Sequence, residues 1–362
     1  MAKIDQLLKF MVKAGASDLH LSSNCLPTLR IDGDMRSFAG EKSEELTPSQ
    51  VHGLLEEIVP DRNKREFDNT RDTDFAYAIA GIGRFRVNVF NDLQGTGAVF
   101  RYIPHKIMSL EDLNMPPVFK TFCALSKGLV LVTGPTGSGK STTLAAMVDY
   151  VNGQRQNHIL TIEDPVEFVH QNNRCLINQR EVKTHTDSFK KALRAALRQD
   201  PDIILVGELR DLETTEIAIE TAETGHLVLG TLHTSTAAST IDRIIDQFPV
   251  EGQAQIRTML ASSLKGVVCQ NLLKKIGKGR VAAMEILVVN TAVANNIREG
   301  KTHQIPNAIQ TGKRFGMQLL NAHLIELVQN KIVAPEEAYL KAADKDDIAA
   351  KLRAAGFTIH GE

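Results

Sequence analysis

Residues 134–141 read Gly-Pro-Thr-Gly-Ser-Gly-Lys-Ser and match the pattern G-x-x-x-x-G-K-[ST]. They directly follow the apolar run Leu129 to Val132, which predicts a buried strand, and a helix is expected after them. Glycines allow successive backbone N–H groups to turn inward, and a helix N-terminus adds the positive end of its dipole. The stretch therefore predicts a phosphate-binding loop between a strand and a helix. The alternative interpretation is a glycine turn with an exposed lysine.

The residue types of this loop indicate its ligands. We expect Lys140 to reach the β- and γ-phosphates of a nucleotide and the Ser141 hydroxyl to bind Mg²⁺, so that ATP and Mg²⁺ are the expected ligands. The residues of the loop predicted to bind nucleotide are Gly134, Pro135, Thr136, Gly137, Ser138, Gly139, Lys140, Ser141 and Thr142.

From the strand before the loop onward, short β-rich runs alternate with helical stretches. This alternation predicts βαβ units around a mainly parallel sheet, which is an α/β fold. After about Thr291 the patterns are helical only. The expected strands are 128–133, 158–162, 203–206 and 227–231, and the expected late helices include 335–343 and 346–355.

The first hundred residues follow a different pattern. Apolar residues at helical spacing predict an opening amphipathic helix that ends near Gly15, and Asp32-Gly33 predicts a hairpin turn. Strands within 18–31 and 73–102 and a helix over 48–59 complete a small α+β domain. The predicted organisation is an N-terminal domain over 1–103, a proline-bracketed linker region over 104–117, an ATPase core over 118–290 and a helical region over 291–362.

Composition excludes several classes of protein. Of the 362 residues 43% are hydrophobic, which is enough for two compact domains. The 42 Lys and Arg balance 43 Asp and Glu, so the net charge of -1 gives no global reason to bind nucleic acid. Four widely spaced cysteines indicate reduced thiols. No apolar run approaches the roughly 18 residues that span a bilayer, so we expect a cytoplasmic protein that reaches a membrane only through a partner.

Hydrolysis of ATP needs a carboxylate that orients or deprotonates the attacking water and an acceptor that holds Mg²⁺. The apolar run 203–206 is followed by Gly207-Glu208, and the run 158–162 is followed by Glu163. Ligands sit at the carboxyl ends of parallel strands, so both acids are candidates. Either could also be a solvated loop carboxylate, but a phosphate loop in the same sheet favours the catalytic interpretation.

Two histidines flank the short strand 227–231. A lone histidine is more often a core or surface residue than a ligand. Because His226 precedes this strand and His233 follows it, we expect Thr231 and His233 to sense the γ-phosphate of the nucleotide.

These elements in this order resemble the secretion-ATPase superfamily, with its Walker A loop, Asp box, atypical Walker B ending in Gly-Glu, and His box. The chain most resembles the type IV pilus retraction ATPases of the twitching-motility family. The segments 15–21, 84–88 and 97–101 resemble the family's N-terminal motifs. The resemblance implies a PAS-like α+β domain followed by a RecA-like ATPase domain with a helical C-terminal end.

The resemblance also implies roles for individual residues. Glu163 would be the catalytic base of the Asp box, which is the segment 161–168. Glu208 would act on Mg²⁺ and water, and His226 and His233 would form the His box. The implied catalytic residues are Lys140, Glu163, Glu208 and His233, the implied Mg²⁺ ligands are Ser141 and Glu208, and the implied further nucleotide contacts are Arg84, Arg86, Arg101, His226 and Thr231. The three arginines would approach phosphates across a domain or subunit boundary, although they also fit solvated strand faces.

The function implied by the resemblance is a hexameric motor ATPase that powers type IV pilus retraction at the inner-membrane face of the pilus machine. Its implied partners are an inner-membrane platform protein and related motor ATPases, and no nucleic acid. The family's retraction motif Ala-Ile-Arg-Asn-Leu-Ile-Arg-Glu appears at 292–299 as Ala-Val-Ala-Asn-Asn-Ile-Arg-Glu. An accessory retraction paralogue, a pilus-assembly ATPase and a type II secretion ATPase therefore stay open.

Two different classes also stay open. A DNA-translocating RecA-like enzyme would use the basic residues Lys190, Lys191, Arg194 and Arg198 of a predicted helix, although a solvated or subunit-contacting face is the other interpretation. A non-hydrolysing, nucleotide-gated interaction module would use the same phosphate loop without turnover.

Overall fold

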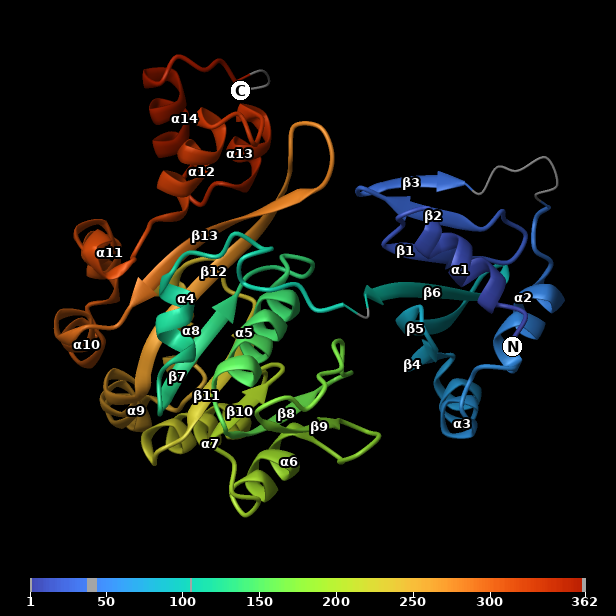
Figure 1. The fold of residues 1–362 in the computed structure, drawn as a ribbon, viewed down its shortest axis with the longest axis horizontal. Coiled ribbons are helices and arrows are strands. Elements are labelled where there is room, and N and C mark those ends of the chain that lie inside the picture. Colours follow the sequence, from blue (N-terminus) through green and yellow to red (C-terminus); the bar gives the residue numbers. More distant parts are fainter. Residues whose placement is uncertain (1, 38–43, 105, 360–362) are drawn as a thin grey trace. The chain divides into compact units, whose positions relative to one another are not determined.

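The computed structural model describes residues 2–37, 44–104 and 106–359 and divides into two units, Met1–Lys106 and Ile107–Glu362 (Figure 1). The second unit is built on a seven-stranded sheet in the order β13-β12-β7-β11-β10-β8-β9. The six strands from β12 to β9 pair in parallel, and only the edge pair β12–β13 is antiparallel. The predicted mainly parallel sheet is confirmed. Its strands are β7 (Gly128–Thr133), β8 (His158–Glu163), β9 (Leu176–Glu181), β10 (Ile203–Val206), β11 (Leu227–Leu232), β12 (Leu264–Lys274) and β13 (Arg280–Val288).

The strand before the phosphate loop is buried on both faces because helices cover both sides of the sheet. Side chains of β7 alternate between two cores: Leu129 and Leu131 belong to one, and Val130 and Val132 to the other. Parallel strands that are buried on both faces have continuous apolar sequences, as β7 has. The covering helices are α4 (Val118–Cys123) and α5 (Lys140–Gln154) on one side, and α6 (Phe189–Ala196), α7 (Leu212–Glu223), α8 (Ala237–Ile245) and α9 (Val250–Ser263) on the other.

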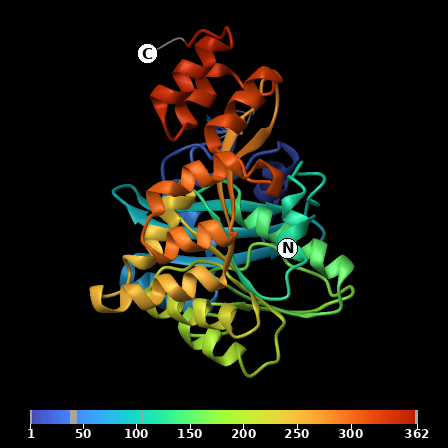
Figure 2. The same ribbon diagram turned by 90° about the vertical axis from the view of Figure 1, so that its left-hand side faces the viewer.

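Helices end the second unit, as predicted. The last three gather beside the tip of the β12–β13 hairpin (Figures 1 and 2), where Leu324 and Leu352 pack with Leu273 of β12. The Asp344 side chain caps the last helix by accepting a hydrogen bond from the Asp347 N–H. These C-terminal helices are α10 (Thr291–Arg298), α11 (Ile305–Thr311), α12 (Leu320–Gln329), α13 (Pro335–Lys341) and α14 (Lys345–Ala354).

The first unit is a six-stranded antiparallel sheet in the order β3-β2-β1-β6-β5-β4. Its apolar face, which includes Phe85, Val87 and Phe100, packs against the helices α1 and α2. The turn at Asp32-Gly33 joins two strands in antiparallel register, so the predicted hairpin is confirmed. The elements are β1 (Asp18–Leu21), β2 (Thr28–Ile31), β3 (Asp34–Ser37), β4 (Asp72–Ile79), β5 (Gly83–Asp92), β6 (Gly95–Pro104), α1 (Asp5–Lys13), α2 (Pro48–Glu56) and α3 (Asp61–Thr70).

Several features of the fold differ from the expected pattern, and the strands β12 and β13 are also absent from the expected strands. The helix α3 was not predicted because its sequence has a single apolar residue, Phe67, and so no helical periodicity. The edge strand β9 was not predicted because it has only two apolar residues in six. Part of the segment 104–117, interpreted above as a linker region, lies in the second unit, where Leu110 is buried in the same core as Val118.

The packing of Gly266 in β12 gives a test of the core around the helix α4. A Cβ at this position would lie 2.4 Å from two ring carbons of Phe122, which is itself buried. Gly266→Ala is therefore expected to lower the free energy of unfolding by roughly 1–3 kcal/mol, measured as a fall in Tm. The matched control is Gly153→Ala in α5, where a Cβ meets no atom of the described chain within 4 Å. This control should raise stability by about 0.5–1 kcal/mol, and an unchanged Tm for Gly266→Ala would contradict the packing.

Candidate nucleotide-binding site

The loop between β7 and α5 has the backbone of a phosphate cradle. The backbone φ angles of Gly134, Gly137 and Gly139 are 141°, 79° and 91°. Residues with a Cβ rarely adopt such positive φ angles, whereas glycine does so at no steric cost. A Cβ on Gly134 would lie 2.2 Å from the carbonyl oxygen of Gln270, so the close approach of β12 also requires glycine there. Gly139 is the N-cap of α5 and has no side chain to cap it, so the first N–H groups of the helix can face an anion.

Two side chains of the loop fit a bound phosphate. The Lys140 Nζ donates to the carbonyl oxygens of Gly134 at 2.8 Å and Pro135 at 3.1 Å, which holds the ammonium over the loop. Burial lowers its pKa, and the carboxylates of Glu208 and Glu167 oppose that shift. The Ser138 Oγ is buried and has no hydrogen-bond partner within 2–37, 44–104 and 106–359, so an oxygen of a phosphate would supply one.

A glutamine that the sequence analysis missed braces the loop from β12. The side chain of Gln270 is buried, with 3% of it exposed. Its Nε2 donates to the carbonyl oxygen of Ser138 at 2.7 Å, and its Oε1 accepts from the Thr143 hydroxyl at 2.9 Å. The amide therefore ties the loop and the first turn of α5 to the neighbouring strand.

The parallel register brings the ends of four strands to one edge of the sheet. Val206 of β10 pairs with Ile162 of β8 and Gly230 of β11, and Leu232 of β11 pairs with Thr133 of β7. The residues that follow these strands, including Glu163, Glu208 and His233, are therefore at the edge where the phosphate loop begins. Gly207 permits the approach of β10, because a Cβ there would lie 3.3 Å from the Glu163 Cα. A larger residue at position 207 would crowd the Asp box.

Glu163 is a largely buried carboxyl group beside a small cavity. Its Oε1 accepts hydrogen bonds from the Thr161 hydroxyl at 2.7 Å and the Gln179 amide at 3.4 Å. Burial raises the pKa of Glu163 to about 7, although both hydrogen bonds act to lower it. The adjoining cavity of about 40 Å³ is also lined by Ser141 and Thr231, and it is large enough for a water molecule.

Glu208 lies in a cluster of polar side chains. Its Oε1 is 2.9 Å from the His233 Nε2, and its Oε2 is 2.7 Å from the Arg210 Nε. The hydroxyl of Thr231 donates to the carbonyl oxygen of Gly207, directly before the carboxylate. The structure thus brings Thr231 and His233 together with Glu208 at this edge of the sheet.

His226 does not lie with them. It precedes β11, its carbonyl oxygen accepts from the Gly128 N–H at the start of β7, and its Nδ1 is 3.2 Å from the Thr221 carbonyl oxygen. The strand β11 has six residues, so this edge of the sheet is about 20 Å from the phosphate loop of the same chain. From this position His226 does not reach a nucleotide bound at the phosphate loop of the same chain.

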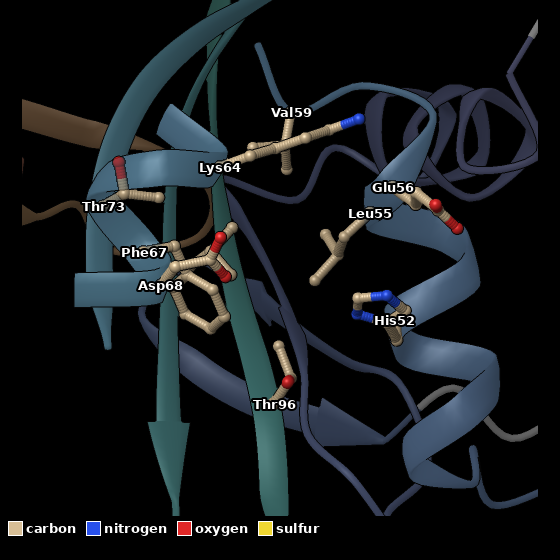
Figure 3. Close-up of a pocket in the computed structure, with 10 residues that line it drawn as sticks. His52, Leu55, Glu56, Val59, Lys64, Phe67, Asp68, Thr73 and Thr96 are labelled. Carbon is tan, nitrogen blue, oxygen red and sulfur yellow. The ribbon is translucent and has the colours of Figure 1, made fainter. Parts of the chain in front are cut away.

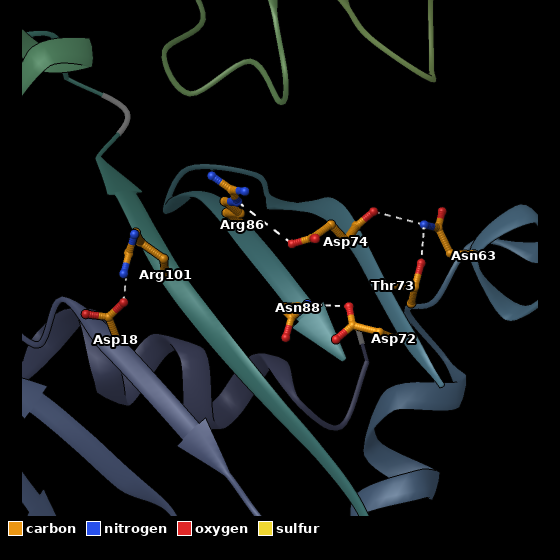
Figure 4. A network of polar contacts seen from close by, with 8 residues as sticks. All are labelled: Asp18, Asn63, Asp72, Thr73, Asp74, Arg86, Asn88 and Arg101. Carbon is orange, nitrogen blue, oxygen red and sulfur yellow. Dashed lines mark hydrogen bonds and ion pairs between the residues drawn. The ribbon is translucent and has the colours of Figure 1, made fainter. Parts of the chain in front are cut away.

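The three arginines belong to the first unit, whereas the phosphate loop belongs to the second. They alternate with buried residues of β5 and β6 and so lie on the sheet face opposite the helices. Figure 4 shows Arg101 paired with Asp18 at 2.9 Å and Arg86 with Asp74 at 3.9 Å. Both pairs are partly exposed, and such pairs contribute little stability. The third arginine of this face is Arg84.

A larger cavity lies in the first unit and contains none of the predicted site residues. It has a volume of about 180 Å³ between α2, α3 and the sheet (Figure 3). Its walls are apolar at Leu55, Val59 and Phe67, and charged side chains of both signs stand at the rim. The rim includes His52, Glu56, Lys64 and Asp68.

A parallel sheet with a phosphate loop and two acids at its carboxyl edge defines a RecA-like P-loop ATPase domain. A family model described as type II/IV secretion system protein matches residues 1–356. The chain therefore belongs to the type II/IV secretion system protein family. No helix in the described ranges is long and apolar enough to cross a membrane.

Individual relatives sharpen this assignment. The chain is 54% identical to the type IV pilus retraction ATPase PilT of Pseudomonas aeruginosa, over 94% of this chain and 98% of that one. It is 37% identical to the type IV pilus ATPase PilU of the same organism, over 96% and 90% of the two chains. A crystal structure of the pilus retraction motor PilT with bound ADP superposes with a TM-score of 0.87 at 42% identity, over 97% of this chain and 100% of that one.

The bracing of the loop by Gln270 predicts an effect on nucleotide binding. Gln270→Leu keeps the approximate volume but removes both hydrogen bonds, so the loop should be less well ordered for phosphate. We expect the Kd for a fluorescent ATP analogue to rise about tenfold. Asn271→Leu is the control, because its amide reaches the Lys341 carbonyl oxygen at 3.4 Å, away from the loop. Equal Kd values for the two variants would exclude the bracing role.

Proposed function

We propose that the chain is a hexameric motor ATPase that hydrolyses ATP to power type IV pilus retraction. The observation that carries the proposal is that the phosphate loop, Glu163 and Glu208 lie at one edge of the sheet. The similarity of the chain to a pilus retraction motor over nearly its whole length supports it. The motor would act at the inner-membrane face of the pilus machine, on a platform protein of that membrane.

The residues of the site divide the chemistry between them. The backbone of the loop and Lys140 would hold the β- and γ-phosphates, and Ser141 and Glu208 would hold Mg²⁺. The bound Mg²⁺ would neutralise charge that develops on the transferred phosphoryl group. Glu163 accepts a proton from the attacking water, and its pKa of about 7 suits a general base near neutral pH.

The cluster around Glu208 provides a route from the nucleotide to the fold. The contact between the His233 ring and the Glu208 carboxylate joins the end of β11 to the end of β10. Loss of the γ-phosphate changes the charge beside this pair, so Thr231 and His233 would report hydrolysis. In the ring, Arg84, Arg86 and Arg101 would approach the phosphates across a domain or subunit boundary.

Principal retraction is favoured over an accessory role. The identity is higher to PilT than to PilU, at 54% against 37%. The altered motif at 292–299 lies largely on α10, where Val293 and Ile297 are the buried anchors. Val293 stands where the family motif has Ile and is still apolar, whereas Ala294 and Asn296, which stand in place of the first Arg and the Leu, are only half-buried. The apolar attachment of this helix is therefore retained.

The DNA-translocating alternative loses support from the contacts of α6. Lys190 is ion-paired with Glu213, and Lys191 is ion-paired with Asp187 at 2.7 Å. Partly neutralised lysines offer less charge to phosphates of a nucleic acid. The non-hydrolysing alternative is separated from the proposal by the turnover measured in the next experiment.

Glu208→Gln tests the proposed hydrolytic site. The amide keeps the shape of the side chain but removes the charge that pairs with His233 and would help to hold Mg²⁺, so ATP should still bind while the turnover number falls about 100-fold or more. Phosphate release measures turnover, and a fluorescent analogue measures binding. Glu213→Gln is the control, because this glutamate is exposed on α7 and pairs with Lys190. Near-normal turnover of Glu208→Gln would remove Glu208 from the mechanism.

Deletion of the gene and complementation with Lys140→Ala test the direction of work. If the motor retracts pili, cells with this variant should be hyperpiliated and should not twitch, because extension continues without retraction. Complementation with the unchanged gene is the control. Cells without surface pili would indicate a pilus-assembly motor and would overturn the proposal.

A further inference from the structure

A glutamine on the edge strand β9 contacts the carboxylate of the Asp box. Gln179 pairs in register with Thr161 of β8, so the two side chains lie on the same face of the sheet. Both donate a hydrogen bond to the same oxygen of Glu163, its Oε1, at 3.4 Å from the Gln179 Nε2 and 2.7 Å from the Thr161 Oγ1. The preceding residue, Asn178, lies on the opposite face, where its amide oxygen contacts the His158 ring at 2.8 Å.

The Gln179 amide has three hydrogen-bond partners, which fix its orientation. Besides Glu163, the Nε2 donates to the Phe168 carbonyl oxygen at 2.8 Å, and the Oε1 accepts from the His170 N–H at 2.8 Å. Both hydrogens of the NH₂ group have acceptors, and the carbonyl oxygen has a donor. A rotation of the amide by 180° would place donor against donor at the His170 N–H, so the NH₂ group is held toward Glu163.

The same strand holds the whole segment that follows Glu163. Two positions after Gln179, the Glu181 Oε2 accepts from the Val166 N–H at 3.1 Å. Val166, Phe168 and His170 are therefore all attached through their backbones to side chains of β9. The edge strand sets the path of the Asp box as well as the position of its carboxylate.

We propose that Gln179 is a positioning residue for Glu163 in ATP hydrolysis. The Gln179 amide holds the Glu163 carboxylate at the cavity that Ser141 and Thr231 also line. This inference depends on the proposed function, because it assigns Gln179 a role through the base. Hydrogen bonds to a charged group favour that group's ionised form. The Gln179 N–H would thus both orient the base and help to keep it ionised.

The other groups around Glu163 define its pH dependence. Glu167, on the segment after β8, carries a like charge that acts to raise the pKa of Glu163. His170 lines the same cavity, and burial lowers its pKa to about 4, so the ring is neutral near pH 7. Around the cavity α5 contributes Ser141, β10 is followed by Gly207, and β11 contributes Thr231, none of which is charged. The ammonium of the loop lysine, Lys140, interacts with the carboxylates of Glu208 and Glu167.

Gln179→Met tests the inference in the full-length chain. Methionine fills a similar volume without donating hydrogen bonds, so the acid limb of the ATPase pH profile should move upward by about half to one pH unit. Turnover at pH 7 should fall about threefold to tenfold with little change in the KM for ATP. Asn178→Leu on the same strand is the control and should leave the pH profile in place. Circular dichroism checks that all variants are folded.

Two further variants separate a positioning role from a merely structural one. Gln179→Glu keeps an acceptor for the His170 N–H but loses the donor to Glu163, so its acid limb should also move upward. Thr161→Val removes the second donor to the Glu163 Oε1 and should act in the same direction. A fall in turnover by one constant factor at every pH for both Gln179 variants, with Thr161→Val shifted, would overturn the role of Gln179. Unchanged turnover in Glu163→Gln would instead overturn the proposed role of Glu163 itself.

Discussion

The contact between the phosphate loop and β12 constrains the rest of the active domain. The Gln270 carbonyl oxygen comes so close to Gly134 that no side chain fits between them, and the Gln270 amide bonds to the far end of the same loop. This contact is made because β12 is parallel to β7 and continues past the end of β7, where the phosphate loop begins. The neighbouring strands then bring their own carboxyl ends to this edge. The geometry of the site is thus a consequence of strand order and direction.

The carboxylate that faces this edge is maintained at a cost in stability. Burial raises the pKa of Glu163 from 4.5 to about 7, so the folded chain binds this proton more tightly than the unfolded chain does. The contribution of this proton to stability is full below pH 4.5 and is lost as the pH rises through about 7. At neutral pH the fold therefore holds a partly ionised carboxyl group in a poorly solvated position. The hydrogen bonds from β8 and β9 reduce that cost without removing it.

The sequence could predict those features that local patterns encode. The glycines of the loop and the apolar strand before it indicated the phosphate cradle, and Glu163 and Glu208 were found because each follows an apolar run. The sequence carries no such local pattern for which residues of different strands come together. His226 and His233 lie directly before and directly after one strand, β11. The direction of this strand in the sheet places His233 at the edge of the phosphate loop and His226 at the opposite edge. Gln179 and Gln270 escaped notice because an amide in a strand has no periodic signature, and their partners are distant in sequence.

The strand β12 also joins the phosphate loop to the C-terminal helices. Gln270 braces the loop, and three residues further on Leu273 is buried with Leu324 of α12 and Leu352 of α14. The segment 270–273 is stiff over so short a distance, because each of its residues pairs with β13 and the pairing of β12 with β7 ends directly before it at Cys269. The loop and the C-terminal helices are therefore attached to one rigid element. A motor needs such an attachment, since a change at the phosphates does work only if it moves something distant from them.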